Sequence, residues 1–172
     1  LIARKAGAAL IAGCTIVIKP SQITPENCTE FGKVIDEVGL PAGVINIVTG
    51  RGSVIGNEMA GSPKIDIVSV TGSVGAGESI MAAASKNITK VSLELGGKAP
   101  AIIFPDADLE ASAQWVLESR IGNNGQICNN AERLYVHKDI KKEFTEILLK
   151  KFQAVKVGDP CQDHSVDMGP LV

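Results

Sequence analysis

The 172-residue chain is poor in aromatic side chains, which make up only 3% of it, with a single tryptophan and a single tyrosine. It therefore offers few platforms on which nucleic-acid bases could stack. The net charge of −2 and the isoelectric point near 5.7 give no general attraction to nucleic acid or to an anionic membrane surface. We expect neither as a partner.

Long hydrophobic runs are also missing. Mean hydropathy is +0.18, yet no apolar stretch approaches the roughly 20 residues that a membrane-spanning helix needs. Hydrophobic residues make up 45% of the chain and charged residues 21%, which is ordinary for a folded domain and excludes a disordered chain.

Cysteine and histidine are sparse and scattered. The four cysteines form no CxxC pair, and no histidine stands at metal-ligand spacing from them, so we expect no metal site. Cys14 and Cys28 fit packing roles, and Cys161 fits an exposed loop. Unpaired cysteines in an α/β chain are typical of a reducing compartment, so we expect a cytoplasmic protein.

Strand-type apolar runs alternate with helical periodicity along the whole chain. This alternation predicts an α/β fold, a doubly wound parallel sheet whose strands are buried on both faces by helices. Gly96-Gly97 is the best candidate for a hinge between two halves. The expected strands are 15–19, 44–48, 66–70, 90–95, 100–104 and 133–137, and the expected helices are 2–12, 25–37, 71–86, 106–121 and 139–154, with a short helix after 49–56.

The chain opens as if inside a helix, with LIARKAGAALIAG, and stops abruptly at VDMGPLV. It has no initiator methionine and no signal-peptide pattern at its start. We therefore expect a fragment of a longer protein, truncated at both ends.

Glycine-rich turns follow two of the expected strands. In VTGSVGAG (70–77), a strand runs through Gly72 and Ser73 into a helix that carries Gly77. Free N–H groups at a helix N-terminus suit a phosphate, although the spacing is not GxGxxG and such glycines are common in plain turns. Gly52 and Gly56, after the preceding strand, allow close approach of a ligand or simply shape a loop.

Two polar residues follow the strand at 15–19. Lys19 ends that strand at its carboxyl edge, where α/β sheets bind ligands, and Gln22 follows three residues later. Both side chains are able to hydrogen-bond ribose hydroxyls. Without further context, a solvated lysine at a strand end is the simpler interpretation.

Two reactive side chains stand out in the second half of the sequence. Glu94 interrupts an apolar strand in LELGG (93–97), which suits either a general base or a salt bridge to Lys90 or Lys98. Cys128 lies in NNGQICNNAERLYV (123–136), a polar, glycine-containing connection where a packing cysteine is unexpected. An open turn with free amides is what a nucleophilic cysteine needs.

The ordered motifs IVIKPSQITP, VTGSVGAG, LELGGKAP, GQICNNAERLYV and MGPL resemble those of the aldehyde dehydrogenase superfamily over the whole chain. Glu94 and Cys128 stand 34 positions apart, as do the general base and the nucleophile of that family. The segments KNITKVSLELGGKAPAI and CNNAERLYV are most similar to those of lactaldehyde and glycolaldehyde dehydrogenases, with succinate-semialdehyde dehydrogenases next.

The resemblance implies oxidation of a small aldehyde to its carboxylic acid with NAD or NADP. Cys128 would form a thiohemiacetal and then a thioester, and Glu94 would activate the water that releases the acid. It also implies a cytoplasmic homo-oligomer, a dimer or tetramer, in the full-length protein. Residues 1–96 would belong to the Rossmann-like NAD(P)-binding domain and residues 97–172 to the first part of the α/β catalytic domain. The cofactor-binding residues implied are Lys19, Gln22, Gly52, Gly56, Gly72, Ser73, Gly77, Leu95 and Gly96.

Two departures from the family pattern bear on this interpretation. The family often has glutamate at the position of Gln22, and a neutral amide repels the 2′-phosphate of NADP less, so either cofactor is possible. The family's oxyanion asparagine and its later nicotinamide-ribose contacts lie outside this chain, so we expect the 172 residues alone to be inactive.

Three alternatives remain open at this point. They are a succinate-semialdehyde dehydrogenase, a CoA-acylating aldehyde dehydrogenase, and, outside enzymes, a non-catalytic nucleotide-binding or structural module. Glu94 argues against CoA acylation, because members of that group usually lack the base at this position.

Overall fold

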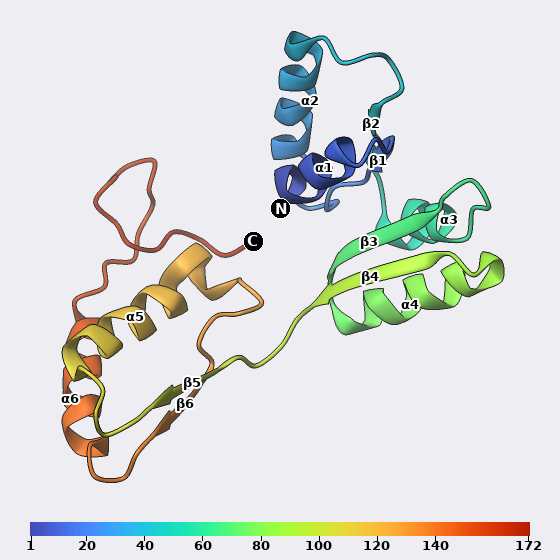
Figure 1. Ribbon diagram of the computed structural model, residues 1–172. Helices are drawn as coiled ribbons and strands as arrows, with labels where there is room; N and C mark the ends of the chain where they lie inside the picture. The colour runs from blue at the N-terminus through green and yellow to red at the C-terminus, as the bar shows by residue number, and fades with distance from the viewer. The chain divides into compact units, whose positions relative to one another are not determined.

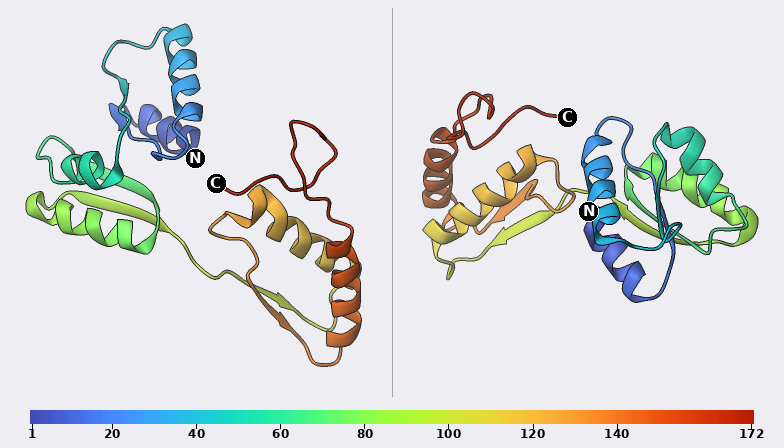
Figure 2. Two further views of the ribbon diagram at one scale, coloured as in Figure 1. Left: turned by 180° about the vertical axis from the view of Figure 1, so that it is seen from behind. Right: turned by 90° about the horizontal axis from the view of Figure 1, so that it is seen from above.

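A computed structural model describes residues 1–172, which form two compact units (Figures 1 and 2). The first unit is Leu1–Leu95 and the second is Gly96–Val172. The boundary coincides with the Gly96-Gly97 pair.

The first unit alternates helices and strands at nearly the positions that the sequence predicts. Its first two helices end next to glycines in the left-handed conformation, Gly13 with φ 78° and Gly39 with φ 73°, where a side chain would be strained. The elements are α1 (Ile2–Ile11), β1 (Ile16–Ile18), α2 (Glu26–Val38), β2 (Ile45–Ile47), the π-helical turn η1 (Gly52–Gly56), α3 (Asn57–Ala60), β3 (Ile67–Gly72), α4 (Val74–Ala84), the 3₁₀ turn η2 (Ser85–Asn87) and β4 (Lys90–Leu95).

The second unit has a helix between its two strands and another after them. Asp108 begins the first of these helices, because its carboxylate accepts a hydrogen bond from the Ala111 N–H at 3.0 Å. The elements are β5 (Pro100–Ile103), α5 (Leu109–Ile121), the 3₁₀ turn η3 (Gly122–Gly125), β6 (Arg133–Val136) and α6 (Lys141–Gln153). No helix of the structure combines the length and the apolar character needed to cross a membrane.

All strand pairs are parallel, which confirms the predicted α/β class. The pairs are β1–β2, β3–β4 and β5–β6, and no strand of one pair is hydrogen-bonded to a strand of another. The chain therefore contains three two-stranded sheets and not one continuous sheet. In β3–β4, Thr71 lies opposite Glu94 and Gly72 opposite Leu95.

Helices cover only one face of β3–β4 (Figure 1). Ala60 of α3 and Ile80 and Ala84 of α4 form the buried centre, against which Val68, Val70 and Val91 of the strands pack. The opposite face exposes Lys90, Ser92 and Glu94. Burial of these strands on both faces was a wrong expectation, because this chain supplies no element to cover the second face.

A separate core holds the second unit together. Phe144 of α6, 1% exposed, packs with Ile103 of β5 and with Ala113 and Val116 of α5. Figure 2 shows α5 and α6 on one side of the β5–β6 pair. This packing fixes the carboxyl end of α5, from which the chain enters the loop that carries Cys128.

Candidate active site

Cys128 lies in the loop between α5 and β6, and its side chain is exposed. The Cys128 N–H donates to no other group of the chain, whereas two nearby loop amides are paired, Gln126 N with Asn123 O and Asn130 N with Ile127 O. An accessible thiol beside an unpaired amide donor can attack an electrophilic carbon and stabilise the resulting oxyanion.

The other three cysteines differ from Cys128 in their surroundings. Cys28 is buried in α2, and burial raises the pKa of its thiol, so its predicted packing role is confirmed. Cys161 is exposed, as predicted. Cys14 is also exposed, so the packing role expected for it is wrong: it follows the end of α1, and no element covers that end.

Glu94 lies on the exposed face of β4 and forms neither an ion pair nor a side-chain hydrogen bond. The alternative of a salt bridge to Lys90 or Lys98 is therefore not realised. Burial lowers the pKa of Lys5 of α1, and the negative charge of Glu94 partly offsets that lowering. An unpaired, accessible carboxylate is able to take a proton from water.

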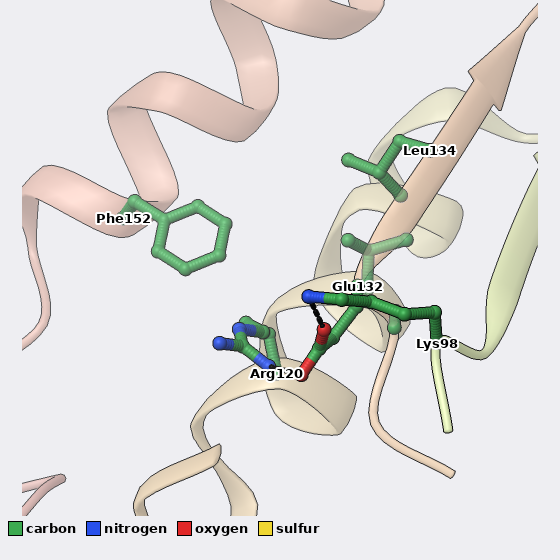
Figure 3. Close-up of a pocket in the computed structure, with 7 residues that line it drawn as sticks. Lys98, Arg120, Glu132, Leu134 and Phe152 are labelled. Atoms are coloured by element: carbon green, nitrogen blue, oxygen red, sulfur yellow. Dashed lines mark hydrogen bonds and ion pairs between the residues drawn. The ribbon is translucent and has the colours of Figure 1, made fainter.

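Lys98 instead pairs with Glu132, which sequence reasoning missed (Figure 3). Arg120, near the end of α5, lies 3.4 Å from the same carboxylate. The hydrogen bond from Lys98, helped by the charges of Lys98 and Arg120, lowers the pKa of Glu132. These three residues line an open pocket of about 310 Å³ whose apolar wall includes Leu134 and Phe152.

Glu132 follows the Cys128 loop in the sequence and pairs with Arg120, which precedes the loop. Glu132 also pairs with Lys98, at the start of the second unit. Beside it, the Arg133 guanidinium donates to the Lys98 carbonyl at 2.8 Å. Only the flanking charges of AERLYV hinted at such a cluster, because its members are far apart in sequence.

Lys19 and Gly50 come from the carboxyl ends of two neighbouring parallel strands, β1 and β2. The Lys19 ammonium is half-buried and donates to the carbonyl oxygens of Pro20 and, at 3.4 Å, of Gly50. Gln22 is exposed in the following turn, and Gly52 has open space where a side chain would begin. A Cβ on Gly56 would lie 3.7 Å from the Ile80 Cδ1 of α4, an ordinary contact distance.

The N-terminus of α4 is open to solvent after β3. Ser73 caps it through its hydroxyl, which accepts from the Ala76 N–H at 3.2 Å, while the Val74 and Gly75 N–H groups have no acceptor. Gly72 and Gly75 leave the approach clear of side chains. Free amides at a helix N-terminus suit an anion such as a phosphate group.

Gly77 and Leu95 contact each other inside the first unit. A Cβ on Gly77 would stand 3.0 Å from both terminal carbons of Leu95, so this glycine allows α4 to pack closely on β4. Gly96 begins the second unit and has open space around it.

The predicted site residues are thus divided between the units. Glu94 and most of the predicted cofactor residues belong to the first unit, and Cys128 belongs to the second. The pairing of Glu94 with Cys128 stays a prediction. The pocket beside Glu132 is lined by none of the predicted site residues, and the same holds for a second pocket, which η1, α3 and α4 line.

An α/β fold with parallel strands, a free helix N-terminus and an accessible cysteine is compatible with several classes of nucleotide-dependent enzyme. The profile of the aldehyde dehydrogenase family matches residues 1–172, and the chain belongs to that family. The match confirms the resemblance that the five motifs indicate.

Individual relatives agree with this assignment. The chain is 56% identical over 172 residues to lactaldehyde dehydrogenase of Escherichia coli (strain K12), covering all of the chain and 36% of that protein. It is 47% identical to 3,6-anhydro-alpha-L-galactose dehydrogenase of Vibrio sp. (strain EJY3), with the same coverage.

Solved structures match equally well. The crystal structure of Escherichia coli lactaldehyde dehydrogenase superposes with a TM-score of 0.96 and 56% identity, over 99% of this chain and 36% of that chain. Aldehyde dehydrogenase C of Pseudomonas syringae, solved with NAD+ and octanal, superposes with a TM-score of 0.92 and 36% identity. That match covers 96% of this chain and 34% of the other. The 172 residues thus span about a third of the length of these relatives.

Proposed function

We propose that this chain is part of an NAD(P)-dependent aldehyde dehydrogenase that oxidises a small aldehyde, of the lactaldehyde or glycolaldehyde kind, to its carboxylic acid. The family match over all 172 residues carries the proposal. Identity to lactaldehyde dehydrogenase, at 56%, supports the substrate class.

Cys128 is the nucleophile of the proposed reaction. Its thiolate attacks the aldehyde carbon and forms a thiohemiacetal, and its unpaired backbone N–H supplies one donor to the new oxyanion. The chemistry supplied by bound NAD(P)+ is hydride acceptance, which makes this adduct a thioester.

Glu94 is the general base of the second half of the reaction. Its carboxylate, free of ion pairs, takes a proton from water as the water oxygen attacks the thioester carbon. The carbon–sulfur bond then breaks, the carboxylic acid leaves, and the Cys128 thiolate is restored. The cycle as a whole therefore regenerates the Cys128 nucleophile.

The cofactor would be held by the carboxyl edge of the first unit, the cofactor-binding part of the protein. Lys19 and Gln22 suit the adenosine ribose, Gly52 and Gly56 the adenine side, and the turn at Gly72 and Ser73 the pyrophosphate. Gly77 allows the close packing of α4, and Leu95 and Gly96 suit the nicotinamide end. The second unit would be the first part of the catalytic domain.

Both NAD and NADP are candidates. Among the related structures, Pseudomonas syringae aldehyde dehydrogenase C holds NAD+ and 3,6-anhydro-L-galactose dehydrogenase holds NADP. We favour NAD for this protein, acting in the cytoplasm as a homo-oligomer.

The proposal is tested by assaying a protein of the relatives' full length that contains these 172 residues. Lactaldehyde, glycolaldehyde and succinate semialdehyde are each supplied with NAD+ and with NADP+, with and without CoA. We expect the highest kcat/KM with a hydroxy-aldehyde and no dependence on CoA. CoA-dependent product formation would instead support the acylating class, and no reduction of either cofactor would support a non-catalytic module.

A further inference from the structure

The turn before Cys128 has an unusual backbone. Asn123, Asn124 and Gly125 all lie in the left-handed region, with φ of 48°, 57° and 79°. Residues other than glycine are strained in this backbone conformation, although asparagine tolerates it better than most. Two consecutive asparagines in this conformation persist only if surrounding contacts hold them.

The Asn124 side chain provides such contacts with a distant segment. Its Oδ1 accepts the Gly169 N–H at 3.0 Å, and its Nδ2 donates to the Pro170 carbonyl at 2.6 Å. The oxygen and the nitrogen of the Asn124 side-chain amide therefore both bond to a single remote segment, whose two residues lie 45 and 46 positions further along the chain. We call this pair of bonds the Asn124 clamp.

The neighbouring contacts of the turn are mostly local. The Asn123 Nδ2 donates to the Gln126 carbonyl at 3.2 Å, and the Gln126 Nε2 returns a bond to the Asn123 carbonyl at 3.3 Å. Gln126 adds one remote contact, at 3.3 Å from the Val172 N–H. The Asn124 clamp has the shorter bonds to the remote segment.

The far side of the loop is held differently. Asn130, 3% exposed, points its Nδ2 at the carbonyl oxygens of Arg120 and Gly122, 3.4 Å from each, and so ties the loop back to the end of α5. Cys128 thus lies between a buried anchor at Asn130 and the strained turn that the Asn124 clamp holds.

We propose that Asn124 is a positioning residue for Cys128. By fixing the left-handed turn to residues 169–170, it sets the direction of the Cys128 thiol and keeps the Cys128 N–H unpaired and facing the thiol's reaction partner. The inference rests on the proposed function insofar as Cys128 is the nucleophile.

The test compares the wild type with Asn124→Ala, Asn124→Gly and Asn124→Asp, each in a protein of the relatives' full length that contains these 172 residues. Alkylation of Cys128 by iodoacetamide is followed by peptide mass spectrometry and divided by the rate at Cys14, an exposed cysteine of the first unit. Amide hydrogen exchange at Gly169 reports the clamp itself, and circular dichroism during heating reports whether each variant is folded.

We expect Asn124→Ala to lower the Cys128/Cys14 ratio at least fivefold and to speed exchange at Gly169 at least tenfold, while the variant stays folded at the temperature of the assay. Asn124→Gly keeps an unstrained left-handed backbone but loses both bonds, so its Cys128/Cys14 ratio should be as low as that of Asn124→Ala. Asn124→Asp keeps the acceptor for the Gly169 N–H, so its ratio should be lowered less.

Asn129→Ala is the matched control, because Asn129 adjoins Cys128, is exposed and makes no side-chain hydrogen bond; its ratio should stay within twofold of wild type. A wild-type ratio in Asn124→Ala or in Asn124→Gly would overturn the proposal, as would an equal loss in Asn129→Ala. Since no aldehyde or cofactor is present, these readings are independent of whether Cys128 catalyses aldehyde oxidation.

Discussion

The carboxylates of Glu132 and Glu94 have different surroundings, because only the first is paired with cations. Glu132 has two cationic partners, Lys98 and Arg120, and its lowered pKa makes it a poor proton acceptor. Glu94, on the exposed face of β4, forms no ion pair and no side-chain hydrogen bond. The difference favours a structural role for Glu132 and agrees with the role as general base that we propose for Glu94.

The stabilising effect of Glu132 should depend on pH. A carboxyl whose pKa is lowered by folding stabilises the folded state above its ordinary value of 4.5, and this stabilisation is lost as pH falls through the lower folded value. We expect Glu132→Gln to lower the melting midpoint at pH 7 and to differ less from wild type below about pH 4.

Circular dichroism during heating, measured from pH 3 to pH 7, follows this transition. Glu30→Gln is the control, because the Glu30–Lys33 pair on α2 is exposed on both sides and should contribute little at any pH. A Glu132→Gln deficit that stays constant from pH 3 to pH 7 would contradict the assignment.

Gln22 is expected to affect the choice of cofactor. A carboxylate at this exposed position would accept from the 2′-hydroxyl of NAD+ and repel the 2′-phosphate of NADP+. In a protein of the relatives' full length, Gln22→Glu should raise the KM for NADP+ about tenfold or more, a change of at least 1.4 kcal/mol in binding, and change the KM for NAD+ less. An equal change in both constants would remove Gln22 from the ribose site.

At the scale of elements, local patterns predicted most of the structure. Alternating apolar residues gave strands at 90–95 and 100–104, and glycines marked the ends of α1 and α2, because these signals depend on neighbours in sequence. The sequence patterns did not predict that the strands form three separate pairs. They also did not predict the ion pairs of Glu132 with Lys98 and Arg120. Both depend on contacts between residues far apart in the chain, which periodicity does not specify.

The candidate site was predictable to a similar degree. Motif order identified the family, and the polar setting of Cys128 agrees with its exposure and unpaired N–H. The exposure of Cys14 and the freedom of Glu94 from Lys90 and Lys98 were not predictable, because they depend on which elements and charges lie nearby in space.

Two glycines of α4 should respond differently to alanine. Gly75 has open space around it, so Gly75→Ala should stabilise the helix by up to about 1 kcal/mol. On Gly77, a Cβ would crowd Leu95 at 3.0 Å, and overpacking costs about 1–3 kcal/mol, which offsets or exceeds that gain. Hydrogen exchange of the α4 amides measures both; equal protection in the two variants would contradict the packing of α4 on β4.

At the scale of the molecule, the chain exposes more surface than compact units of its size. Its accessible area is 11822 Å², whereas two separate compact units of about 9 kDa would expose roughly 9,700 Å² together. Apolar side chains contribute to the excess, among them Ile102, Phe104 and Trp115, each at least 60% exposed. Relatives of three times this length have more chain with which to cover such surfaces.

We therefore expect the isolated 172 residues to self-associate or aggregate and to show no dehydrogenase activity. Sedimentation velocity over a range of concentrations tests the first point, and aldehyde-dependent reduction of NAD+ or NADP+ tests the second. A concentration-independent monomer, or turnover by this chain alone, would show that the 172 residues are sufficient by themselves.

The division of labour between Cys128 and Glu94 is tested most directly by the pre-steady-state kinetics of Glu94→Gln in a protein of the relatives' full length. We predict a burst of about one reduced cofactor per Cys128, a steady-state rate lowered by about 10² or more, and an acyl group on Cys128 found by peptide mass spectrometry. Unchanged steady-state turnover, or an acyl group on any other residue, would contradict it.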